Sequence, residues 1–271
     1  MKRNIVNRVK LGVLLLVFTG TTSCEYETMV DIPYPDEKVY LPAAVDGVYN
    51  IDEGLSTGWI NNTPGQPSRF SVNKESKEFN VQLGVYRSGT GNGGTATATI
   101  VADTDTVTAL ISNGTLEEIK LLPADKYQIG QPDVVIKSGE NTGLFTLVVD
   151  LEFLKNNAPQ KYAIGVRIST ADREVNSLYG TAILLIDTKI LQLEVDFIPQ
   201  YDASIPNLVN FKNSSLYGES FLWNFGDGSS SSEVNPQHTY TLSGEYDASL
   251  KVTGIAGNTV TVTKKITIDI P

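Results

Sequence analysis

The sequence predicts an all-β protein made of two immunoglobulin-like β-sandwich domains in tandem. Three observations predict this fold class. The 271 residues include 23 Gly, 12 Pro and 12 Tyr, and Val, Ile and Thr recur throughout, a composition that favours strands and turns. Apolar and polar residues alternate in many short segments, which is the pattern of half-buried strands. The length accommodates two domains of ordinary size.

Residues 1–23 have the pattern of a bacterial lipoprotein signal peptide. Basic residues precede a short apolar run at 11–18, and small residues follow it. The run is too short to span a bilayer, which takes about 20 apolar residues. Cys24, the only cysteine, comes directly after the small residues, so we expect it to carry a lipid. Thr21 stands where the lipobox consensus has Leu, and lipoboxes in Bacteroidota are looser than that consensus.

Residues 24–37 are acidic and contain prolines without periodicity, which indicates an extended tether. Glu25 and Glu27 resemble the signal that exports Bacteroidota lipoproteins to the outer leaflet, and a merely solvated linker is the alternative. We therefore expect an outer-membrane protein, exposed at the cell surface. No later run of the sequence is apolar and long enough to span a membrane.

The charge and the scarcity of His and Cys exclude several classes of function. Residues 1–23 hold four basic and no acidic residues, so their removal leaves 17 basic against 31 acidic residues, a net charge of −14. Such a surface repels nucleic acid and anionic lipids, so the lipid would be the only membrane contact. With one His, and with its one Cys acylated, the chain offers few metal ligands or nucleophiles. We expect no metal, no cofactor and no disulfide.

Residues 38–189 form the first predicted domain. Residues 89–94 predict a hairpin-like turn. One helix is expected at residues 104–112, where Asp103 would cap it and Gly114 would end it. Four segments predict strands: residues 77–86, 144–154, 161–168 and 178–186.

Residues 190–271 form the second predicted domain, with the size and strand spacing of an immunoglobulin-like sandwich. Apolar residues alternate inward from Tyr246 to Val252 and from Val260 to Ile268, where Lys264 interrupts the series. The boundary near residue 190 has no Gly/Ser-rich linker.

One motif in this domain combines aromatic residues with a glycine turn. Its residues are Trp223, Phe225, Gly226, Asp227 and Gly228, followed by His238, Tyr240 and Tyr246. Their order, W-x-F-G-D-G, then P-x-H-x-Y and G-x-Y, resembles that of a polycystic kidney disease (PKD) domain. The aromatic residues would fill the core, the two glycines would allow positive φ, and the aspartate would bond turn amides.

Each of these residues also has a functional interpretation, which we weigh against the structural one. His238 could be a metal ligand or a general base, but no second His or Cys accompanies it. Asp227 could bind calcium with Asp247 or Glu245, although no D-x-D-x-D-G loop is present. Trp223 could stack on a sugar. The PKD resemblance implies structural roles, and we adopt these.

Four segments of the first domain occur in the order of a known family: Val39–Ala43, Leu121–Tyr127, Val135–Glu140 and Tyr162–Ser169. They resemble an N-terminal lipoprotein domain of unknown function, number 1735, that also precedes the catalytic module of some family 18 endo-glycosidases. The resemblance implies a β-sandwich, a surface location and an association with glycan foraging, but no set of ligand residues. Ser112-Asn113 departs from the Tyr-Asn pair that often ends the short helix in this family.

No catalytic motif accompanies these domains. The acidic strand of a family 18 hydrolase, the H-E-x-x-H motif and the P-loop are absent from the sequence, so we expect no enzyme activity.

The sequence thus predicts a surface lipoprotein that binds or positions glycan for a polysaccharide-utilisation system. Its expected partners are a polysaccharide or glycoprotein glycan and other outer-membrane glycan-uptake proteins. The alternative is a structural spacer or an adhesin-like protein-interaction module of an outer-membrane complex. Solvent-facing aromatic residues would distinguish the two, because sugars pack on aromatic rings. Trp59, in the polar segment 54–66, is the first candidate, and Tyr49 and Tyr86 are weaker ones because both can face inward.

Overall fold

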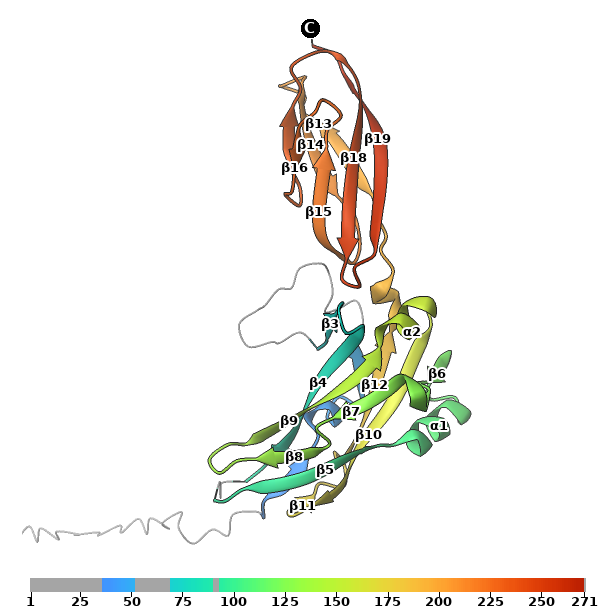
Figure 1. Ribbon diagram of the computed structural model, residues 1–271, viewed down its shortest axis with the longest axis vertical. Helices are drawn as coiled ribbons and strands as arrows, with labels where there is room; N and C mark the ends of the chain where they lie inside the picture. Colours follow the sequence, from blue (N-terminus) through green and yellow to red (C-terminus); the bar gives the residue numbers. More distant parts are fainter. Residues whose placement is uncertain (1–35, 52–68, 90–92, 271) are drawn as a thin grey trace, which may run out of the picture. The chain divides into compact units, whose positions relative to one another are not determined.

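The structure is a computed structural model that describes residues 36–51, 69–89 and 93–270. The predicted signal peptide, Cys24, most of the tether and Trp59 lie outside the described residues. The described chain is mostly strands, arranged in four sheets (Figure 1). This arrangement confirms the predicted all-β class of two β-sandwiches. Among the described residues, no helix has the length and apolar character needed to cross a membrane.

The first sheet of the N-terminal sandwich is built around an antiparallel pair of long strands, β4 and β9. Alternate residues of β4, from Phe79 to Val85, are buried, as the alternation predicts. The strand at one edge, β11, pairs with β1 in parallel. The strand order is β11 (Glu174–Val175), β1 (Lys38–Tyr40), β4 (Glu78–Arg87), β9 (Thr142–Asp150) and β7 (Tyr127–Gly130), and β3 (Ser71–Asn73) also pairs with β4.

The second sheet packs its inner side against the first to form one apolar core. Its strand order is β2 (Val48–Ile51), β12 (Thr181–Asp187), β10 (Lys161–Ala171), β5 (Ala96–Ala102) and β8 (Asp133–Ile136), and β6 (Ile119–Leu121) also pairs with β10. Within the described residues, short 3-10 helices occupy three connections: η2 (Pro42–Ala44), η4 (Ala124–Lys126) and η5 (Thr188–Leu191).

The predicted helix, α1 (Thr104–Ser112), covers one end of the outer side of the second sheet. The Asp103 side chain caps it by accepting a hydrogen bond from the Thr106 amide at 3.1 Å. Val107 is buried against Ala163 of β10. Gly165 lets the helix start approach closely, because a Cβ at this position would lie 2.3 Å from the Asp103 carbonyl oxygen.

The strand predicted over residues 144–154 is shorter in the structure, and its second part is a helix. Strand β9 ends at Asp150, and helix α2 (Leu151–Asn156) begins directly after it. The Asp150 carboxylate accepts a hydrogen bond from the Phe153 amide at 2.9 Å, so it acts as an N-cap that turns the chain. Leu151 and Leu154 remain buried, now on one side of a helical turn.

The C-terminal sandwich has a three-stranded and a four-stranded sheet around its own core. The predicted inward series is correct for Ala248, Leu250 and Val252, but Val260 is 38% exposed. Lys264 occupies the next inward position of this series. Its charge is accommodated at the edge of the core, because its Nζ lies 2.7 Å from the Asp196 carboxylate. The strand order of the three-stranded sheet is β13 (Phe197–Tyr201), β14 (Leu208–Asn213) and β17 (Gln237–Thr239). The strand order of the four-stranded sheet is β16 (Ser230–Ser231), β15 (Gly218–Asn224), β18 (Gly244–Gly254) and β19 (Thr259–Ile268).

Candidate functional site

The structure separates the two predicted ligand residues that it describes. Tyr49 lies on β2 and packs against the core, and the Arg69 guanidinium covers its ring at 4.3 Å from the ring centroid. Tyr86 lies on β4, between the buried Val85 and Arg87, and so projects from the outer side of the first sheet. Only Tyr86 therefore has the setting of a binding residue.

Tyr86 belongs to a cluster of three tyrosines. Tyr40 pairs with Tyr86 across β1 and β4, and their ring centroids are 5.3 Å apart with a tilt of 54°. Tyr179 adds a third ring, 6.2 Å from that of Tyr40. Tyr179 also packs against the core, and its carbonyl accepts a hydrogen bond from the Leu41 amide at 2.9 Å. Three segments distant in sequence thus meet at this cluster.

Uncharged residues continue the surface beside Tyr86. The strand register places Thr142 next to Tyr86, Leu144 next to Gly84 and Thr146 next to Gln82. Leu144 is 53% exposed. Gly84 has no side chain, and the side chains of Thr142 and Leu144 lie over it. We call this surface the tyrosine face, consisting of Tyr40, Tyr86, Tyr179, Gln82, Gly84, Thr142, Leu144 and Thr146.

The phenol group of Tyr40 stays neutral at physiological pH. Burial raises the pKa of Tyr40 above its ordinary value, and the neighbouring Tyr86 raises it further. A neutral phenol both donates and accepts hydrogen bonds. The tyrosine face therefore combines ring surfaces with hydroxyl and amide groups, and it contains no Asp, Glu, His, Lys or Arg.

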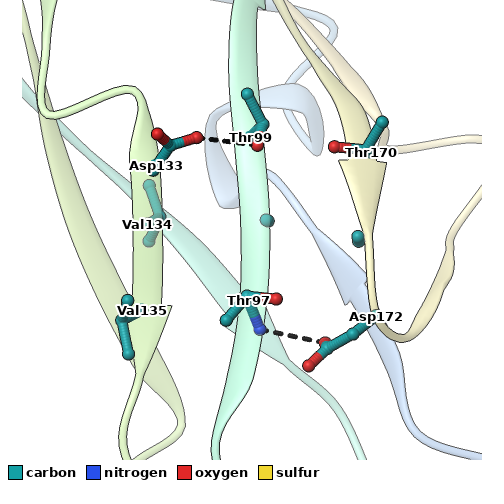
Figure 2. Close-up of a pocket in the computed structure, with 9 residues that line it drawn as sticks. Thr97, Thr99, Asp133, Val134, Val135, Thr170 and Asp172 are labelled. Atoms are coloured by element: carbon teal, nitrogen blue, oxygen red, sulfur yellow. Dashed lines mark hydrogen bonds between the residues drawn. The ribbon is translucent and has the colours of Figure 1, made fainter.

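A second feature is an open hollow of about 400 Å³ on the outer side of the other sheet. Figure 2 shows β5 in its centre, flanked by β8 and β10. Two rows of side chains cross these strands. One row contains Asp133, Thr99 and Thr170, and the other contains Val135, Thr97 and Asp172.

The PKD motif of the C-terminal sandwich lies largely in its core. Trp223 is fully buried, and its Nε1 donates a hydrogen bond to the Glu233 carbonyl at 2.8 Å. The buried Tyr240 donates its hydroxyl to the Phe225 carbonyl at 3.0 Å. Tyr246 is half-buried, and its ring lies 4.3 Å from that of Tyr240. Trp223 therefore presents no ring surface to a sugar.

The glycine turn of the motif holds the only histidine against an aspartate. Gly226 and Gly228 have φ of 86° and 93°, the left-handed region that favours glycine. His238 Nε2 lies 2.7 Å from the Asp227 carboxylate, which also accepts a hydrogen bond from the Ser229 amide at 3.0 Å. Serine and aspartate contact the same ring nitrogen, so the three side chains lack the arrangement of a catalytic triad.

One of the other carboxylates suggested for calcium, that of Glu245, has a different partner. Glu245 forms an ion pair with Lys265 at 3.0 Å. The part of the chain that the structure describes contains no group of three or more His, Cys, Asp or Glu suited to a metal ion.

A family model described as an N-terminal domain matches residues 34–175, slightly more than half of the chain. The chain belongs to this N-terminal-domain family. A PKD-domain model matches residues 206–270. Together, the matches confirm the two family resemblances found in the sequence, an N-terminal family domain followed by a PKD domain.

The curated relatives resemble the PKD region alone. Collagenase ColA of Bacillus cereus is 43% identical over 112 residues, which is 40% of this chain and 12% of the collagenase. The chain spans only 6% to 12% of the length of the curated peptidases that it matches.

Two solved structures are among those to which the chain is similar. The PKD1 domain of the Vibrio cholerae metalloprotease PrtV is 31% identical, with a TM-score of 0.26, over 28% of this chain and 95% of that domain. An auxiliary nutrient binding protein from Bacteroides thetaiotaomicron is 18% identical, with a TM-score of 0.34, over 76% of this chain and 60% of that protein.

Proposed function

We propose that this protein is a non-catalytic glycan-binding lipoprotein of the cell surface and that the tyrosine face binds the glycan. The observation that carries the proposal is the pair formed by Tyr40 and Tyr86, two adjacent rings on the solvent side of a rigid sheet. Aromatic rings supply large apolar contact area with little loss of conformational entropy, and their hydroxyl groups remain able to bond.

The polar groups around the two tyrosine rings match the hydroxyl groups of a sugar. A pyranose presents C–H groups on its ring faces and hydroxyl groups at its edge. With the sugar ring on Tyr86, the edge hydroxyl groups would meet Thr142, which lies directly opposite Tyr86 on β9. Apolar contact with a few placed polar groups is the usual composition of small-molecule sites.

The charge distribution favours a neutral glycan. The protein carries a net charge of −10, yet the residues of the tyrosine face are all uncharged. The neighbouring pair Lys38 and Glu174 neutralise each other at 2.7 Å. A strongly charged partner would find no complementary group on this surface.

The lipid anchor would determine where in the cell this binding site lies. A lipid on Cys24 and the tether to residue 37 would hold the sandwich at the outer membrane, where a polysaccharide or a glycoprotein glycan arrives from outside. Other outer-membrane glycan-uptake proteins are then the partners to which a bound glycan would pass. The lack of carboxylate and imidazole groups on the face supports a role in capture rather than in cleavage.

Affinity electrophoresis of residues 25–271 tests the proposal, with mannan, starch, xylan and mucin as the immobilised glycans. At least one glycan should retard the unaltered chain. Tyr86→Ala and Tyr40→Ala should each abolish most of the retardation. Tyr201→Ala is the matched control, because Tyr201 is a 51% exposed tyrosine on β13 of the PKD domain.

Other outcomes of this experiment contradict the proposal in different ways. Loss of retardation with Trp59→Ala, but not with Tyr86→Ala, would move the site to the segment 54–66. No retardation by any glycan would favour the alternative of a spacer or adhesin-like module. Retardation that Tyr201→Ala abolishes would assign binding to the PKD domain.

A further inference from the structure

We propose that the hollow on the outer side of the second sheet is a separate subsite that binds one sugar residue through its hydroxyl groups. The hollow spans three strands, with β5 as its floor and β8 and β10 at its sides (Figure 2). Its volume of about 400 Å³ lies at the lower end of the range of small-molecule sites, about 300–1,000 Å³. It is on the opposite sheet from the tyrosine face.

The hollow exists because the sequence places short side chains on the central strand and leaves this end of the sheet uncovered. Outward residues of β5 at this end are Thr97 and Thr99. Helix α1 covers only the part of β10 around Ala163 and Gly165. A register shift after Ile168 keeps Thr170 opposite Thr99. Bulges of this kind often re-aim side chains next to binding sites.

Hydrogen-bonding groups line the hollow at opposite corners. Asp133 accepts a hydrogen bond from the Thr99 hydroxyl at 2.8 Å through one carboxylate oxygen. Asp172 accepts one from the Thr97 amide at 2.9 Å, also through one oxygen. The second oxygen of each carboxylate retains acceptor capacity. The hydroxyl of Thr170 supplies a donor in the same row as Asp133.

This arrangement suits a polyhydroxylated ring better than a cation. Asp133 begins β8 and Asp172 directly follows β10, in different rows on opposite sides of β5, so their Cα atoms are roughly 12 Å apart by ordinary strand spacing and the two carboxylates do not share one centre. Asp172 is partly neutralised by Arg173, whose Nη1 lies 3.8 Å from its second oxygen. A sugar ring bridges such a distance with hydroxyl groups on both sides. Val135, 53% exposed, offers its methyl groups to the ring's C–H surface.

The inference rests on the proposed function only for the class of ligand, a carbohydrate. The two sites are tested separately by titrating ¹⁵N-labelled residues 25–271 with D-glucose, D-galactose, D-mannose and N-acetyl-D-glucosamine, and then with spermidine as a cationic probe. We expect at least one sugar to shift the amide signals of Thr97, Thr99, Asp133 and Thr170 saturably, with millimolar affinity and no dependence on salt.

Three variants complete the test. Asp133→Asn should weaken the sugar's binding at least fivefold, and Thr170→Leu should fill the hollow and abolish it. Asp125→Asn is the control, because its carboxylate is 73% exposed elsewhere on the same sandwich. Each variant's melting temperature verifies its fold. Tyr86→Ala should leave these shifts unchanged, so failure of the tyrosine face and failure of the hollow are distinguishable.

Two results would overturn the inference. One is the absence of saturable shifts at these amides with all four sugars. The other is salt-sensitive binding of spermidine at these amides without binding of any sugar, which would assign the hollow to cations.

Discussion

The rings of Phe225 and His238 are stacked face to face, with centroids 4.2 Å apart and an angle of 2° between their planes. The histidine ring thereby covers the end of the aromatic core, while its Nε2 contacts the Asp227 carboxylate at 2.7 Å. Tyr240 completes the arrangement: its ring centroid lies 4.6 Å from that of His238, with an angle of 81° between the ring planes. His238 thus connects the core of the PKD domain to its glycine turn.

The stability of the PKD domain should fall in acid through Asp227. Burial alone would raise the pKa of this carboxyl, but hydrogen bonds from Ser229 and His238 outweigh it and lower the pKa from 3.8 to about 2. The ionised form is therefore favoured in the folded state. Its stabilisation is fully present above pH 4 and is lost as the pH falls toward 2. The melting temperature measured from pH 6 to pH 2 should show this loss.

Asp227→Asn should remove this part of the pH dependence. The variant should melt below the unaltered protein at pH 6, and the difference should shrink as the pH approaches 2. An equal difference across the whole range would show that Asp227 acts without ionisation. His238→Ala should also lower the melting temperature but leave glycan binding unchanged. If it abolished binding with the fold intact, the structural role of His238 would be wrong.

Trp223→Ala should destabilise the PKD domain by about 3–5 kcal/mol, as the truncation of a large core aromatic does. Trp223 is fully buried and packs on Phe197 and Phe211, with ring centroids 5.1 and 5.5 Å away. Urea unfolding followed by circular dichroism measures the loss. Leu222→Ala is the control, since Leu222 is the next residue of β15 and is 51% exposed. Equal losses in both variants would contradict a core role.

The sequence analysis predicts local elements better than it predicts the tyrosine face. Helix α1 and its cap at Asp103 depend on neighbouring residues, which a short segment reveals. The pairing of Tyr40 with Tyr86 depends on strands 46 residues apart in sequence, and only the register of β1 on β4 places the rings together. The outward position of Tyr40 is partly predictable, because Tyr40 follows Val39, whose side chain is buried, and successive strand residues face opposite sides of the sheet.

The hollow could not be predicted from the sequence for the same reason, because it depends on how strands distant in sequence pair. Asp133, Thr99 and Thr170 form one row only after β8 and β10 pair with β5 and β10 shifts its register. The error at residues 144–154 has a different origin. Apolar residues continue through both β9 and α2, and the cap formed by Asp150 decides where the strand ends. An aspartate within an apolar run is weak evidence by itself, since it also fits an outward strand position.

Arg87 should stabilise the end of the N-terminal sandwich where two connections meet. Its side chain is buried, and its guanidinium donates to the carbonyls of Gly94 at 3.0 Å and Glu140 at 2.7 Å. Arg87→Met preserves much of the side-chain volume but removes these donors, so we expect a loss of about 1–3 kcal/mol in unfolding free energy. Arg167→Met, at an exposed position of β10, should change it by less than about 0.5 kcal/mol. Equal effects would refute the role of the buried guanidinium.

Cys24→Ala should release the protein from the outer membrane. Without the thiol no lipid can be attached, and the mature surface is too acidic to bind anionic lipid headgroups by itself. Fractionation of cells that express the full chain, followed by immunoblotting, measures the shift from the membrane to the soluble fraction. Protease treatment of intact cells then tests exposure, and removal of Glu25 and Glu27 should reduce it while leaving the anchor in place. Membrane partition unchanged by Cys24→Ala would disprove the lipid anchor.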